Sequence, residues 1–186
     1  MPLISPTILD QSIKEGPVLG PLAVWAWAHA YRSTEAMGRA RPLGVRIDGA
    51  KGAARLLGAR VRTVERYWGR WRQLFERGED GLWRPRPEAW PAPSSWATTS
   101  GGHPRYVSLG AASLVRLMHL GSSRRAWSCQ RLALSLLSRA GAAGAAGKAS
   151  IPLGSGLLHR WLKMAPKTAT RAVRGLRVAG LLHLYS

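Results

Sequence analysis

The sequence predicts a mainly α-helical protein with two small domains, and three observations carry that prediction. Residues 52–75 have apolar side chains at a helical period that a glycine interrupts, so they form two short helices around a turn at 58–60. Residues 156–184 repeat this arrangement near the end of the chain. Between them, residues 88–104 are rich in proline, serine and glycine, as linkers between domains are. We therefore place a domain boundary near residue 96.

The N-terminal stretch is expected to provide an arm and a buried helix. Residues 1–19 carry prolines and a glycine around a short polar run, which is typical of an arm with little regular structure. Residues 22–35 are apolar and rich in tryptophan, and Pro21 fits an early helical position, so they predict a core helix. This stretch is too short to span a membrane comfortably and lacks the pattern of a secretory signal. The first domain is placed at 20–88.

The next residues lead into the first pair of helices and a hairpin after it. Residues 38–44 are rich in glycine and arginine and predict a linker, and residues 45–47 predict a short strand. Asp48 stands where the N-cap of the following helix belongs. After the two helices, Asp80-Gly81 predicts a tight turn, which is how a small hairpin would begin beside the second helix.

The two helices within 52–75 have matching faces. Ala54 is small where the helices cross, Gly58 permits the turn, and Val64 fills the corner between them. This pattern resembles the helix-turn-helix of DNA-binding proteins, and the resemblance implies that the second helix reads DNA. An ordinary basic helical hairpin with a solvated charged face is the alternative. The side chains expected to point outward are Arg60, Arg62, Thr63, Arg66 and Arg70.

The C-terminal half predicts a second domain at 106–186, after a linker at 89–105. Its expected elements are helices over 109–120 and 123–140, a glycine-alanine loop at 141–147 and an extended stretch at 151–155. A support helix at 158–162, a turn at 164–166 and a reading helix at 167–178 follow.

The end of the chain has the order found in bacterial winged-helix repressors. Thr168 lies near the start of the second helix, and Ala172, Leu176 and Gly180 fall at the core positions and at the start of the wing. The segment resembles the reading half of those repressors, which implies a winged-helix-like fold with short β wings. Two features depart from the pattern. Lys163 stands where a glycine is expected in the turn, and the sequence after the reading helix has room for only one wing strand.

A shift of 105 positions lays the first helix pair on the second, so that Thr63 matches Thr168 and Arg66 matches Arg171. A chance match between two arginine-rich segments is the alternative. A tandem of two such domains resembles plasmid replication initiators, which implies that both domains grip consecutive major grooves of a repeated site. The first domain with its hairpin also resembles the N-terminal DNA-binding region of transposases.

The charge of the chain points to a polyanionic partner. The sequence has 28 Lys and Arg against 9 Asp and Glu, a net charge of +19. No acidic residue follows Glu88, which excludes paired-carboxylate or carboxylate-metal catalysis in the C-terminal half. Cys129 is the one cysteine and suits a buried packing position, and the histidines lack metal-ligand spacing. We expect no enzyme activity, metal, cofactor or small-molecule ligand, and a cytoplasmic location with the nucleoid or a plasmid.

Together these features predict a sequence-specific protein for double-stranded DNA, most simply a plasmid or mobile-element replication initiator. A transcriptional repressor or a transposon-derived DNA-binding module is an alternative, and a basic RNA-binding or ribosome-associated protein is one of another class. A second copy of the chain and other replication proteins are further candidate partners. The base-reading candidates are the five outward residues above with Lys167, Thr168, Thr170, Arg171 and Arg174. The phosphate-binding candidates are Lys51, Arg55, Arg84, Arg86 and Arg160.

Overall fold

The computed structural model describes residues 3–30, 43–92, 95, 98, 102, 105–108, 110–142 and 155–182. These residues are mainly helical, as expected, with two small antiparallel pairs of strands. None of the described helices is long and apolar enough to cross a bilayer. In chain order the elements are β1 (Leu3–Ile4), α1 (Pro6–Lys14), α2 (Leu19–Ala30), α4 (Gly49–Leu57), α5 (Val61–Leu74), β2 (Phe75–Arg77), β3 (Trp83–Pro85), the 3₁₀ turn η1 (Pro87–Ala89), β4 (Val107–Ser108), α6 (Ala111–Met118), α7 (Arg124–Ala142), α8 (Ser155–Leu162) and α9 (Pro166–Val178).

The predicted N-terminal arm is wrong, because residues 6–14 form helix α1. Ser5 caps this helix, since its hydroxyl oxygen accepts a hydrogen bond from the backbone N–H of Thr7 at 3.2 Å. Pro6 occupies the first helical position, where the missing N–H of a proline has no helical partner to lose. Ile8 and Leu9 on this helix are fully buried. Pro6, one of the prolines that suggested an irregular arm, therefore marks the start of a helix.

The predicted core helix is present as α2, although it begins three residues earlier than residue 22. It is buried on nearly all sides, as its almost uniformly apolar sequence requires. Trp27 packs edge-on against Trp90, with ring centroids 5.5 Å apart. Residues 31–42, which include the end of the predicted helix and most of the predicted glycine-arginine linker, lie outside the described part of the chain.

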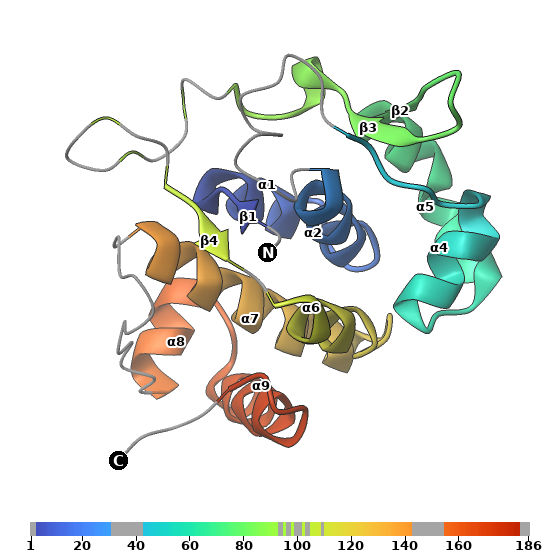
Figure 1. Cartoon of the computed structure of the whole chain (residues 1–186). Helices are drawn as coiled ribbons and strands as arrows, with labels where there is room; N and C mark the ends of the chain where they lie inside the picture. Colours follow the sequence, from blue (N-terminus) through green and yellow to red (C-terminus); the bar gives the residue numbers. More distant parts are fainter. Residues whose placement is uncertain are drawn as a thin grey trace.

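The apolar core crosses the predicted domain boundary near residue 96. Buried side chains from α1 and α5 belong to the same cluster as Leu114 and Met118 of α6 and Leu134 of α7. In Figure 1, α1 and α2 occupy the middle of the molecule, and α7 runs past α1 on its way toward α8 and α9. The Ser138 hydroxyl of α7 donates a hydrogen bond to the Pro6 carbonyl at 3.3 Å. The segments before and after residue 96 therefore share a core. Their division into two domains stays a prediction.

The strands form two separate pairs. Strand β1 pairs with β4, with Leu3 opposite Ser108, so the start of the chain lies against the segment that leads into α6. Strand β2 pairs with β3 as the hairpin expected beside the second helix. The strand predicted over 45–47 is reduced to one bridge, in which Val45 pairs with Trp83 of the hairpin.

The C-terminal helices follow the predicted order with small shifts at their ends. The helices predicted over 109–120 and 123–140 appear as α6 and α7, and α7 extends into the start of the predicted glycine-alanine loop. The rest of that loop and residues 151–154 of the predicted extended stretch lie outside the described residues. A second apolar cluster joins α7 to α8 and α9 through Cys129, Leu132, Leu158, Leu162, Met164, Ala169, Ala172 and Leu176.

The spacing of 105 residues recurs in the order of the elements. Helices α1 and α6 begin at Pro6 and Ala111, and helices α5 and α9 begin at Val61 and Pro166, each pair 105 positions apart. Helices α2 and α7 begin at 19 and 124, with the same separation. Helices α4 and α8 begin 106 positions apart, so the order of the elements follows the spacing of the predicted internal repeat, which itself stays a prediction.

Candidate nucleic-acid interface

The first helix pair, α4 and α5, is joined by the turn that the sequence predicts. Gly58 ends α4 with a φ of +57°, a left-handed conformation that favours glycine. The backbone N–H of Ala59 donates to the Ala54 carbonyl at 2.9 Å, which closes the turn before α5 begins. Ala54 and Val64 are buried between the helices. Asp48 precedes α4 as expected, but its side chain makes no capping hydrogen bond.

One face of α5 turns cationic side chains to solvent. Arg62 and Arg66 are exposed and lie four residues apart, so they occupy the same side of the helix. Arg60 is exposed at the N-cap, and Thr63 is half-buried at the edge of this face. Three arginines and a threonine hydroxyl are therefore grouped around the N-terminal half of α5.

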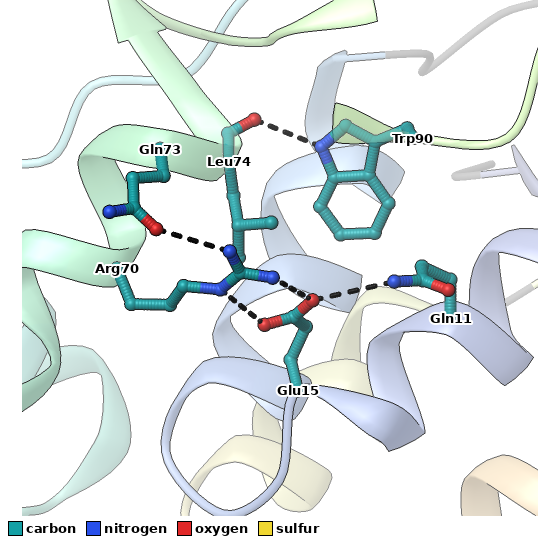
Figure 2. Close-up of polar contacts among 6 residues, drawn as sticks. All are labelled: Gln11, Glu15, Arg70, Gln73, Leu74 and Trp90. Carbon is teal, nitrogen blue, oxygen red and sulfur yellow. Dashed lines mark hydrogen bonds and ion pairs between the residues drawn. The ribbon is translucent and has the colours of Figure 1, made fainter. Parts of the chain in front are cut away.

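Arg70, predicted as a base reader, is instead engaged within the protein (Figure 2). Its Nε and Nη2 each donate to the Glu15 carboxylate at 2.9 Å, and its Nη1 donates to Gln73 at 3.1 Å. The hydrogen bonds to Glu15 raise the pKa of the Arg70 guanidinium above its ordinary value. Gln11 also donates to Glu15, at 3.4 Å, and the Glu15 side chain is only 7% exposed. Arg70 thus ties α5 to the end of α1.

Arg84, predicted to bind phosphate, is also a structural residue. Its guanidinium is nearly buried, pairs with both carboxylate oxygens of Asp80 and reaches the Leu43 carbonyl. A Cβ on Gly78 would lie 2.6 Å from Arg84 Nη1, so the bare glycine leaves room for this ion pair. Arg84 therefore closes the hairpin through Asp80, and its contact with phosphate stays a prediction.

The remaining phosphate candidates are more accessible. Lys51 and Arg55 are exposed on α4, and Arg160 is exposed on α8. Arg86 is half-exposed, but its Nε donates to the Arg72 carbonyl at 3.0 Å and its guanidinium lies 3.7 Å from Glu88. Arg86 is therefore partly committed to holding the residues after the hairpin against the end of α5.

The second helix pair, α8 and α9, reproduces the turn without a glycine. Lys163 has a φ of +52°, close to that of Gly58, which it matches in the repeat. The imidazole of His159 makes a hydrogen bond to the Met164 carbonyl at 2.7 Å and so supports the same turn. The predicted departure from the pattern is therefore one of residue type, since the backbone adopts the left-handed conformation with a lysine.

Helix α9 has a cationic exposed face. Lys167, Arg171 and Arg174 are exposed at spacings of four and three residues, which places them along one side of the helix. Thr170 is exposed and its hydroxyl donates to the Pro166 carbonyl at 3.1 Å, while Thr168 is half-buried. No ion pair joins a described cation of residues 105–182 to a carboxylate.

The site residues predicted from the sequence do not include one flank of α5. Arg72 and Gly69 lie on the side of α5 that faces the start of α4, next to the half-buried Trp68. Arg72 makes no ion pair within the described residues. The sequence offered a signal, because the spacing of 65, 68, 69 and 72 places these residues on one side of a helix.

No protein-family model, curated protein or solved structure matches the chain. Two exposed helix faces carry grouped cations, α5 with Arg62 and Arg66 and α9 with Arg171 and Arg174. Guanidinium groups on the side of a helix can pair with phosphates or with guanine in a DNA major groove, which is wide enough to admit an α-helix.

Proposed function

We propose that the protein binds double-stranded DNA in a sequence-specific manner through α5 and α9. In this proposal each helix pair is a helix-turn-helix, and the hairpin β2–β3 is the wing of a winged-helix-like unit. The observation that carries the proposal is the recurrence of one arrangement. A left-handed turn residue, Gly58 or Lys163, precedes a helix whose outer face carries a matched arginine, Arg66 or Arg171, free of any ion pair in the described structure.

The net charge of +19 supports a nucleic acid as the partner. The described tryptophans near α5 do not favour single-stranded RNA, because Trp71, Trp83 and Trp90 are buried and leave few rings on which bases could stack. The hairpin tip carries Glu79 and Asp80, so the wing is not a basic finger for phosphates. We therefore assign the contacts with bases to the two helices.

For the biological role we propose a plasmid or mobile-element replication initiator. Two reading helices on one chain would suit a site longer than one helical turn, and the repeated order of elements supports a tandem arrangement. A transcriptional repressor or a transposon-derived module would use the same contacts. A location with the nucleoid or a plasmid in the cytoplasm follows from this role.

Selection of bound duplexes from a random pool tests the proposal. We expect one preferred sequence and a footprint longer than one helical turn. Direct repeats in the selected duplexes would favour an initiator, and a palindrome would favour a dimeric repressor. Structured RNA that outcompetes duplex DNA at moderate salt would instead support an RNA-binding protein.

Single substitutions then separate base contacts from phosphate contacts. We expect Arg66→Ala and Arg171→Ala each to weaken binding to the selected duplex by about 1–3 kcal/mol, with a smaller effect on random duplex. Arg55→Ala on α4 is the control, because the loss of a phosphate contact should weaken binding to both duplexes equally. Equal losses for Arg66→Ala on both duplexes would move this residue to the phosphate class.

A further inference from the structure

Gly69 lies inside α5 on its exposed side, with no contact among the described residues that explains a glycine there. A Cβ built on Gly69 meets no atom within 4 Å. Two other glycines inside helices have a packing reason, since a Cβ on Gly20 would lie 2.6 Å from the Ser12 carbonyl oxygen and one on Gly175 would lie 2.7 Å from Cys129 Sγ. Glycine is less favourable than alanine in a helix interior. The helix therefore gives up stability at Gly69 without an internal gain.

Gly69 forms part of the wall of a groove along the flank of α5. Two adjoining hollows of about 580 and 430 Å³ share Gly49, Trp68 and Arg72, and together they run from the start of α4 past Gly69 toward the hairpin. An added methyl group at residue 69 would project into the open part of this groove.

The charges along the groove suit an anionic partner, such as a phosphate backbone, better than a basic or apolar segment. Lys51, Arg72 and Arg77 contribute positive charge along its length, while Asp48 and Glu65 lie at the end nearest α4. Arg72 occupies the shared middle of the groove and has no carboxylate partner in the described residues. The half-buried Trp68 ring adds an apolar surface beside this cation.

We propose that this groove receives one sugar-phosphate strand of the duplex, that Arg72 contacts a phosphate, and that the bare Cα of Gly69 provides the clearance for the strand. The inference rests on the proposed DNA binding. A helix that lies in the major groove is flanked by the two phosphate strands, so a strand must pass along one side of α5. Arg62 and Arg66 on the adjacent face then point toward the bases, and Arg72 fixes the depth of the helix.

The test is Gly69→Ala, measured by thermal unfolding and by affinity for the selected duplex. We expect the midpoint of unfolding to rise by about 2–4 °C, because alanine favours the helix. We expect the affinity to fall by about tenfold or more, because the methyl group meets the strand. Ser113→Ala on the exposed side of α6 is the matched control, since it also favours a helix but should leave the affinity unchanged.

Arg72→Ala tests the phosphate contact independently. We expect equal losses on selected and random duplexes and a slope of log affinity against log salt that is smaller by about one contact. In the double variant with Gly69→Ala and Arg72→Ala, the fold loss of affinity for duplex should be less than the product of the two single losses. Both substitutions act on the same strand.

A failure of the proposed strand contact and a failure of the proposed DNA binding would give different results. If Gly69→Ala binds duplex as tightly as the natural protein while Arg66→Ala weakens binding, the proposed role of Gly69 in making room for the strand is wrong. The proposal that α5 reads DNA then stands. If Gly69→Ala weakens binding to structured RNA but not to duplex, the strand in the groove is RNA and the inference fails. If the natural protein binds no duplex, the proposed function itself fails.

Discussion

Lys163 holds a left-handed backbone conformation, with a φ of +52°, at the turn between α8 and α9. A side chain in this conformation costs about 1–2 kcal/mol relative to the right-handed helical region. We expect Lys163→Gly to raise the free energy of unfolding by about 0.5–1 kcal/mol, after the greater freedom of glycine in the unfolded chain is included. Urea denaturation measures the change. Lys163→Ala is the control, because alanine keeps the strain, and a glycine variant no more stable than the alanine variant would contradict the prediction.

The helical period predicted which side chains are exposed better than it predicted what they contact. It placed Arg66 and Arg171 on exposed faces, and both are exposed. It could not assign Arg70, because the partner Glu15 lies 55 positions away on another helix. Arg84 and Asp80 are only four positions apart, but they face each other across a hairpin that the sequence only began to define. The partner of Arg70 depends on a tertiary contact that no local pattern reports.

Helix α9 lies close against α7 where Gly175 meets Cys129. A Cβ on Gly175 would lie 2.7 Å from Cys129 Sγ, so Gly175→Ala must push the sulfur or the helices apart. We expect it to lower the free energy of unfolding by about 1–3 kcal/mol in urea denaturation, although alanine favours a helix in isolation. The double variant with Cys129→Ala should recover most of this loss. A stabilising effect of Gly175→Ala alone would show that the crossing is looser than 2.7 Å implies.

The positions of most elements could be predicted from the sequence, and the exceptions have a common cause. Helices α5 and α9 have apolar residues at a clear helical period, which fixes their extent within one residue of the described helices. Helix α1 was missed because its proline reads as a chain breaker unless its N-cap is recognised. The single wing strand expected after α9 would fall largely on residues 183–186, which lie outside the described residues.

At the scale of the molecule, the predicted separation of the two halves did not anticipate their packing. Composition changes across residues 88–104, and this suggested a boundary. The contact between α1 and α7, however, joins residues about 130 positions apart, as in the hydrogen bond from Ser138 to Pro6. An amphipathic face shows that a helix needs a partner, but not which helix supplies it. The arrangement of the two reading helices therefore depends on α7, which contributes to both apolar clusters.

The shared helix leads to a prediction about cooperativity. Leu134 of α7 packs in the first apolar cluster and Leu132 in the second, and both are fully buried. Replacing either with alanine should lower the free energy of unfolding by about 2–5 kcal/mol. Tryptophan fluorescence reports chiefly on the first half, because seven of the nine tryptophans precede residue 97. If α7 joins both halves into one unit, Leu132→Ala will lower the fluorescence-detected midpoint in urea as well as the midpoint seen by circular dichroism.

Leu134→Ala is the matched comparison for that experiment, because it removes the same groups from a site that contacts the first cluster directly. Its fluorescence and circular dichroism midpoints should shift together in either case. A Leu132→Ala variant whose fluorescence midpoint stays unchanged while its circular dichroism midpoint falls would mean that the halves unfold separately. The relative orientation of α5 and α9 would then be set by the linker, and a footprint of fixed length would no longer be expected.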